Sequence, residues 1–164
     1  MRTEPIVLAD IVDKTRVLTK YFIGKLHHIN LHETFSSGPY SLNSAFWIIA
    51  HIAVTQNGLL LRCTGGDAMR ISWAKKFNMG STVPEAADAP PIEEVLSVLD
   101  EVHQRSLTHI RTMDPAFLEE LNPAGFEILG ENTVRGMITH AIRHEASHAG
   151  QLGWLCKLHG IKSI

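Results

Sequence analysis

The sequence has little of what marks membrane-spanning, secreted or nucleic-acid-binding proteins. No apolar run approaches the roughly 20 residues that cross a bilayer, and the first residues lack the apolar core of a signal peptide. The formal net charge is −2, so the chain lacks the basic excess that binding to phosphate backbones requires. Two cysteines, Cys63 and Cys156, are too few for a disulfide framework. We therefore expect a cytoplasmic protein with neither a nucleic-acid nor a membrane partner.

What the sequence does contain is the pattern of a helical bundle. Its 164 residues, 45% of them apolar, suit a single domain over residues 1–164 with a full hydrophobic core. Apolar residues recur at steps of three and four in four segments, and no convincing strand accompanies them. The predicted helices span about 5–29, 41–64, 91–113 and 133–159. The sequence therefore predicts an all-α fold, a four-helix bundle.

Residues at the ends of these segments agree with helix boundaries. Ser41 is a plausible N-cap of the second helix, Gly65-Gly66 is a clear stop, and Gly160 follows the end of the fourth helix. The buried face of the first helix is predicted at positions spaced by three and four: Leu8, Ile11, Thr15, Leu18, Phe22, Leu26 and Ile29.

The connection between the second and third helices, residues 65–91, is unusually long for a compact domain. Glycines and prolines interrupt it, yet it contains the large apolar side chains of Trp73, Phe77 and Met79. These residues need a surface to pack against, so we expect an ordered flap.

Three histidines occupy positions of the predicted helices that otherwise face the core. His144 and His148 are one turn apart in the apolar seam of the fourth helix, and His51 lies between Trp47 and Val54 in the second. Burying an imidazole costs free energy unless its nitrogens find partners. One shared divalent metal would satisfy all three rings, and three protein ligands with one open position are typical of catalytic zinc. The alternative is three hydrogen-bonded core histidines in a non-catalytic binding or dimerisation module.

The segment from His144 to His148 also reads His-Glu-x-x-His, the signature of zinc peptidases. The extended signature fails because Gln151 and Trp154 stand where glycine and histidine are required. No acidic residue follows Glu145 to act as a third ligand. We therefore exclude a peptidase, and we expect Glu145 to be a surface residue or a carboxylate near the ligands.

The remaining histidines of the third and fourth helices are predicted to lie outside the site. His140 is one turn before His144 but off the seam, so we expect it on the surface. His103 and His109 flank the apolar face of the third helix and are expected to be solvated.

Three segments resemble the DinB/YfiT-like superfamily of metal-binding four-helix proteins. They are Trp47-Ile-Ile-Ala-His51-Ile-Ala, Trp73-Ala-Lys-Lys-Phe77-Asn-Met-Gly80 and His144-Glu-Ala-Ser-His148-Ala-Gly-Gln151-Leu152. Ala149 replaces an arginine that is common in the family, so any contact made by that arginine is absent here. The order of the segments matches over nearly the whole chain.

The resemblance implies an up-down-down-up bundle with a long crossover between helices 2 and 3. It also implies that His51, His144 and His148 bind a divalent ion, usually zinc or nickel, and that the protein forms a homodimer. Some relatives are transferases or isomerases that use low-molecular-weight thiols such as bacillithiol or mycothiol. We therefore expect a metal-dependent enzyme that activates a small thiol or water, either thiol S-transferase-like or hydrolase-like. Trp47 and Gln151 are expected to line its pocket, walled by residues 65–91.

Overall fold

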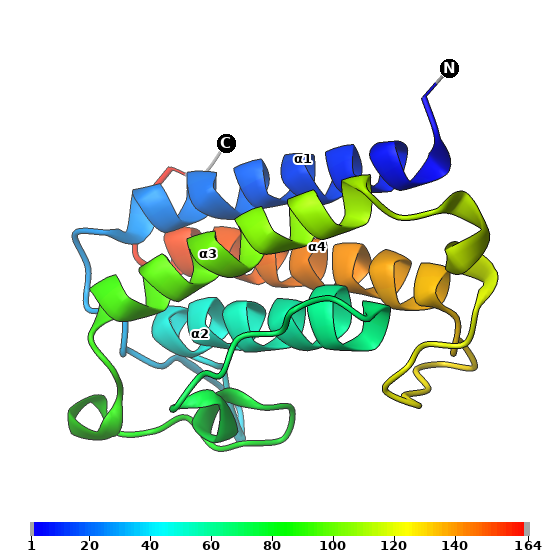
Figure 1. The fold of residues 1–164 in the computed structure, drawn as a ribbon. Helices are drawn as coiled ribbons and strands as arrows, with labels where there is room; N and C mark the ends of the chain where they lie inside the picture. The colour runs from blue at the N-terminus through cyan, green and yellow to red at the C-terminus, as the bar shows by residue number, and fades with distance from the viewer. Residues whose placement is uncertain (1, 163–164) are drawn as a thin grey trace.

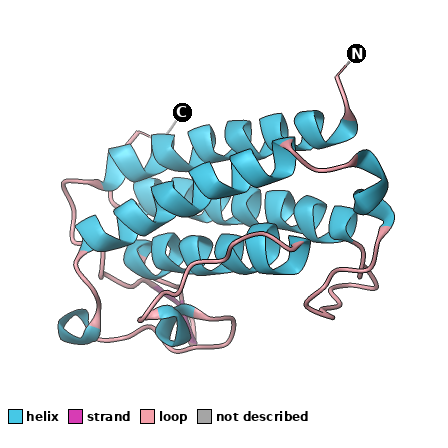
Figure 2. Ribbon diagram, viewed as in Figure 1, coloured by secondary structure: helices cyan, strands magenta, loops and turns pink. Residues whose placement is uncertain are grey.

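The structure is a computed structural model that describes residues 2–162. Four long helices dominate it, as Figure 2 shows: α1 (Glu4–Leu26), α2 (Ala45–Gln56), α3 (Ile92–Arg111) and α4 (Val134–Leu158). The predicted all-α, four-helix fold is confirmed. One detail differs, because the two-residue strands β1 (Ser36–Ser37) and β2 (Tyr40–Ser41) form a small antiparallel hairpin before α2.

Local hydrogen bonds explain where α2 and α4 begin. The Ser44 hydroxyl accepts a hydrogen bond from the Trp47 backbone N–H, so Ser44 is the N-cap of α2. The prediction of Ser41 as this cap was wrong, because Ser41 belongs to β2. Thr133 caps α4 in the same way, with its hydroxyl accepting from Gly136 N–H.

The helical course of α2 extends beyond its regular part to the predicted glycine stop. A π-helical turn (Asn57–Leu61) and a short 3-10 turn (Arg62–Thr64) follow Gln56 directly. Gly65 then ends the helix in the left-handed region, at φ 77°, where glycine has no steric penalty.

The directions of the helices follow from the residues that meet at their ends. Contacting pairs are Glu4–Arg135 between α1 and α4, Asp10–Arg111 between α1 and α3, and Gln56–Ala141 between α2 and α4. Hence α1 runs parallel to α4, whereas α3 is antiparallel to α1 and α2 is antiparallel to α4. Figure 1 shows the same directions, with residues 65–91 running back along the bundle from the end of α2 to the start of α3.

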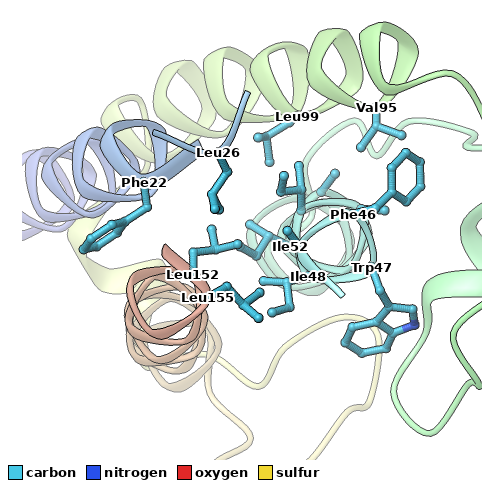
Figure 3. Close-up of a cluster of buried hydrophobic side chains, with 14 of the residues drawn as sticks. Phe22, Leu26, Phe46, Trp47, Ile48, Ile52, Val95, Leu99, Leu152 and Leu155 are labelled. Atoms are coloured by element: carbon cyan, nitrogen blue, oxygen red, sulfur yellow. The ribbon is translucent and has the colours of Figure 1, made fainter. Parts of the chain in front are cut away.

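The largest core cluster lies where all four helices meet. In Figure 3 side chains of α1, α2, α3 and α4 converge, among them Leu26, Ile52, Leu99 and Leu152. A second cluster joins the first half of α1 to the first half of α4 and the end of α3. None of the helices described for residues 2–162 is both long enough and apolar enough to span a membrane.

The buried face of α1 differs from the predicted one. Ile11 and Leu18 are 43% and 40% exposed, whereas Val12 and Arg16 are buried. The residues that face the bundle instead follow Leu8 at steps of four, namely Val12 and Arg16. This correction places a charged side chain inside the core.

Residues 65–91 form an ordered covering over α2, as predicted, except that Met79, which was expected to pack with it, is 88% exposed. Trp73 and Phe77 are buried against the main core, and the Trp73 indole N–H donates to Glu94 Oε1 at 2.8 Å. Short 3-10 helices, Ala74–Phe77 and Ala86–Asp88, shape the segment. Because this covering adds to α3 and α4, every residue from 45 to 53 of α2 is buried.

Candidate metal centre

The imidazoles of His51, His144 and His148 come together between α2 and α4. His144 Nε2 lies 3.1 Å from His51 Nε2 and 3.2 Å from His148 Nε2. One ligand atom from each ring lies within 4.8 Å of the others, a group that could hold a metal ion. His51 is buried, and the other two rings are half-buried. The structure thus brings together the three histidines singled out in the sequence.

Hydrogen bonds from residues 65–91 orient the His51 ring. Its Nδ1 lies 2.6 Å from the Phe77 carbonyl oxygen. Since a carbonyl oxygen only accepts, Nδ1 carries the proton and Nε2 keeps its lone pair. Trp47 stacks on the ring at 4.5 Å, and its indole N–H donates to Ser81 Oγ at 3.3 Å. The covering segment therefore fixes both the tautomer and the plane of the ring.

A glutamine orients the His148 ring in the same way. His148 Nδ1 donates to Gln151 Oε1 at 2.8 Å, which leaves the Nε2 lone pair directed at the other rings. His144 Nδ1 is buried and has no hydrogen-bond partner among the described residues. Two Nε2 lone pairs therefore converge on the third ring. Lone pairs that face each other are unfavourable unless a proton or a cation lies between them.

Burial keeps these histidines neutral, the form that binds metals. Desolvation lowers the pKa of His51 and of His148, and it is the largest cause of the fall in the pKa of His144 to about 3. The neighbouring rings lower the pKa of His144 further. At neutral pH the site therefore presents uncharged imidazoles, and no proton has to be displaced before a cation binds.

The spacing of the nitrogens also fits a tetrahedral ion. With a metal–nitrogen distance of about 2.05 Å, the edge of a tetrahedron is about 3.3 Å. The two Nε2–Nε2 distances from His144 are 3.1 and 3.2 Å, and all three ligand atoms lie within 4.8 Å of one another. The bonds from Nδ1 of His51 and His148 to oxygen acceptors are also those that hold metal-ligating histidines in place. The residues present therefore fit a divalent metal.

A groove adjoins the site at the start of α2. It encloses about 320 Å³ and is lined mainly by residues of α2, α4 and the segment before α2: Ser41, Leu42, Asn43, Ile48, Gln151, Trp154, Leu155 and Leu158. Gln151 thus contacts both His148 and the groove, in agreement with its prediction as a pocket residue. Trp47 is at the site through its stack on His51, but it does not line this groove. No residue of 65–91 lines the groove either, contrary to the prediction that this segment forms its wall.

Several predictions for residues around the site were wrong or incomplete. Glu145 is not on the surface: it is 1% exposed and paired with Arg16. His103 is also buried, and its Nε2 lies 3.0 Å from Asp13 Oδ1. His140, which was expected on the surface, is half-buried. Its Nδ1 is enclosed and has no hydrogen-bond partner among the described residues.

One residue at the site was not found from the sequence, and one further prediction for a histidine was wrong. Thr55 is one turn after His51, and its hydroxyl lies 3.4 Å from His51 Nε2. Its spacing of four residues from His51 was a usable signal. His109, predicted to be solvated, is half-buried with Nε2 3.0 Å from both oxygens of Thr64, away from the three-histidine group.

Comparison with known proteins identifies the family of the chain. No curated protein matches the chain. The sequence pattern that defines the DinB superfamily matches residues 13–152, which include α2, α3, all three clustered histidines and most of α1 and α4. Because this match extends over most of the sequence, the chain belongs to the DinB superfamily.

Proposed function

We propose that the protein is a divalent-metal-dependent enzyme whose metal is held by His51, His144 and His148. The observation that carries this proposal is the convergence of three neutral imidazoles between α2 and α4, with nitrogens 3.1 and 3.2 Å apart. Zinc and nickel are the ions we propose, because imidazole suits both. Membership of the DinB superfamily supports metal binding as the use of this cluster.

The protein's own groups would hold and orient the ligands. Phe77 O and Gln151 Oε1 keep the protons of His51 and His148 on Nδ1, so that both Nε2 atoms face the centre. A tetrahedral ion with three histidine ligands has one further coordination position. A thiol or water bound to the ion at that position would have a lowered pKa. Trp47 and the residues 65–91 shield the His51 side from solvent, which strengthens electrostatic interactions at the site.

For the substrate we propose a small molecule, in the first place a low-molecular-weight thiol. The groove beside Gln151 has room for a small molecule at about 320 Å³, and its walls include the apolar side chains of Ile48, Trp154 and Leu155. A thiol S-transferase-like reaction is the first form of the proposal. A hydrolase-like reaction with water in the same position is the second.

Metal content is the first test. Protein purified without an affinity tag is expected to bind about one equivalent of zinc or nickel. The variants His51→Ala, His144→Ala and His148→Ala should each lose it. His103→Ala removes a buried histidine outside the cluster and serves as the matched control. Wild-type protein that stays metal-free, with no thermal stabilisation by either ion, would contradict the proposal.

Cobalt substitution separates the thiol from the water form. A thiolate bound to Co²⁺ produces an intense near-ultraviolet charge-transfer band, whereas water does not. The Co²⁺ protein is expected to develop this band when a small thiol such as cysteine is added, and an alcohol of the same size should leave the spectrum unchanged. If the thiol produces no band, the hydrolase-like form remains.

A second candidate function is that of a non-catalytic dimerisation module, and one apolar surface supports it. The outer side of α1 exposes Val7, Ile11, Val17 and Leu18, each at least 40% accessible. We propose that this side contributes to a homodimer. Analytical ultracentrifugation of wild type and Ile11→Glu tests the dimer: a wild-type monomer would contradict it. A dimer that binds no metal would favour the non-catalytic module.

We further propose that the protein acts in the cytoplasm. Its two cysteines, Cys63 and Cys156, are buried and unpaired, as expected for a reducing compartment. Fractionation of source cells, with metal-loaded protein in the cytoplasmic fraction, tests this proposal.

A further inference from the structure

The carboxylate between the two histidines of α4 is enclosed by hydrogen bonds inside the bundle. Glu145 Oε1 lies 2.6 Å from Arg16 Nε and 2.9 Å from Thr19 Oγ1, and Oε2 accepts from Arg16 Nη2 at 3.1 Å. Gln56 Nε2 donates to the same Oε2 at 2.7 Å. The carboxylate therefore accepts four hydrogen bonds from α1 and α2, although its side chain is 1% exposed.

The donors of this network are themselves tied to the other helices. Arg16 Nη1 donates to the backbone oxygen of Leu99 on α3 at 2.8 Å. Gln56 Nε2 also lies 3.1 Å from the backbone oxygen of Ala141 on α4. The network thus links all four helices through side chains that are buried.

The network lies on the inner faces of the two helices that carry the histidines. On α4, Glu145 is adjacent to His144, and successive side chains on a helix point about 100° apart. The histidines and the carboxylate therefore leave α4 in different directions, and the carboxylate points into the interior of the bundle. On α2, Gln56 follows His51 by five residues and bonds α4 at two points. A shift of α2 along or across α4 would break these bonds and move His51 relative to His144.

Small side chains lie near the network in both helices. Around the network, Ala53 and Ala149 are small residues, and apolar contacts tolerate small displacements better than hydrogen bonds do. A buried ion pair is costly to desolvate and is often no more stabilising than apolar residues of the same size. A role in positioning explains why charged groups occupy this place.

We propose that Glu145, held by Arg16, Thr19 and Gln56, is a positioning residue that sets the distance between the histidine of α2 and those of α4. The inference rests on the proposed metal site. Glu145 does not touch the metal. It acts through the relative placement of the two helices, and its loss should widen or distort the site while the bundle remains folded.

The test compares Co²⁺ affinity and the Co²⁺ ligand-field spectrum among variants that are folded by circular dichroism. Glu145→Gln removes the charge of the carboxylate and keeps its shape. Arg16→Lys keeps the positive charge but loses the paired donors Nε and Nη2 that bind both carboxylate oxygens. Thr19→Val removes a single donor and is the mild variant if the other two fail to fold. Affinity is expected to fall about ten- to a hundredfold in the first two variants, with a changed spectrum, and less in Thr19→Val.

The matched control is Leu118→Ala, which destabilises the second core cluster without removing any hydrogen bond of the network. It should keep wild-type affinity and spectrum. Network variants that are folded yet bind Co²⁺ with wild-type affinity and an unchanged spectrum would overturn the inference and leave the metal site intact. If wild-type protein itself does not bind Co²⁺, the metal proposal fails, and the inference fails with it.

Discussion

Arg16 on α1 and Glu145 on α4 form an ion pair inside the bundle, 129 residues apart in sequence. Arg16 Nε lies 2.6 Å from Glu145 Oε1, and the two side chains are 3% and 1% exposed. Nothing in the spacing of apolar residues reveals that these two charges meet. The pair nevertheless connects the first helix to the centre of the helix that carries His144 and His148.

Removal of one partner of the Arg16–Glu145 pair should strongly lower the free energy of unfolding. In the metal-free protein, Glu145→Gln is expected to lower the free energy of unfolding by about 3–5 kcal/mol, because Arg16 stays buried without its counter-charge. The double variant Arg16→Met/Glu145→Gln should recover part of this loss. Urea unfolding measures both.

The exposed pair of Arg105 and Glu101 is the control, and Glu101→Gln should cost less than about 1 kcal/mol. A cost for Glu145→Gln as small as that of Glu101→Gln would show that the interior pair is not desolvated in solution.

Gln151 should tune metal affinity through His148. Its Oε1 accepts from His148 Nδ1 at 2.8 Å, so Gln151→Ala is expected to weaken zinc binding about tenfold. Gln151→Glu supplies a carboxylate acceptor, makes the ring more basic and should at least restore wild-type affinity. Competition with a chromogenic chelator measures the change. Gln104→Ala, at an exposed position of α3, should have no effect. Equal affinities in all variants would mean that this hydrogen bond does not orient the ligand.

Metal affinity should depend weakly on pH near neutrality. Protons compete with the metal for the same nitrogens, and the pKa values of His51, His144 and His148 are all lowered, that of His144 to about 3. More of the rings therefore stay neutral as pH falls from 8 to 6.5, and affinity should fall less than it would for three histidines with ordinary pKa values. Three histidines with the ordinary pKa of about 6.5 would lose about sevenfold in affinity over this range. Co²⁺ titrations in weakly coordinating buffers distinguish the two outcomes.

Two glycines of α4 make a matched pair for testing the packing of α1 on α4. A Cβ at Gly153 would lie 3.1 Å from the Phe22 ring, whereas one at Gly150 would meet no heavy atom within 4 Å. Gly153→Ala is expected to destabilise the fold by about 1–3 kcal/mol through overpacking. Gly150→Ala should stabilise it by about 0.5–1 kcal/mol, because alanine is the better helix former. Thermal unfolding measures both. A stabilising Gly153→Ala would show that Phe22 does not pack closely on α4.

Much of the fold could be predicted because its information is local. The ends of α3 and α4 and the glycine stop at Gly65 follow from capping residues and from apolar spacing. The start of α2 was misplaced from Ser44 to Ser41, since both serines can cap and only the β1–β2 hairpin distinguishes them. The face of α1 was misassigned, because a chain of exposed apolar residues competes with a buried set that contains Arg16.

For the histidines too, local spacing could be read from the sequence, whereas the tertiary contacts could not. The pair His144 and His148 could be recognised from one helix alone, since a spacing of four residues puts both rings on one face. His51 was added from its place among apolar residues in another helix. His103 has a similar sequence setting beside an apolar face, yet it is buried against Asp13 and lies outside the cluster. Sequence spacing therefore selects rings that face a core, but not the partner that each ring meets there.

The sequence by itself determined the helical bundle and the three histidines, because helix periodicity and caps depend on residues within a few turns. Only the tertiary structure decided the surroundings of Glu145. In sequence it belongs to a peptidase-like signature, but α4 turns its side chain towards Arg16, Thr19 and Gln56. Tertiary packing also decided which nitrogens carry protons, through Phe77 O and Gln151 Oε1. Hydrogen bonds between distant segments require the chain to be folded, and no periodicity records them.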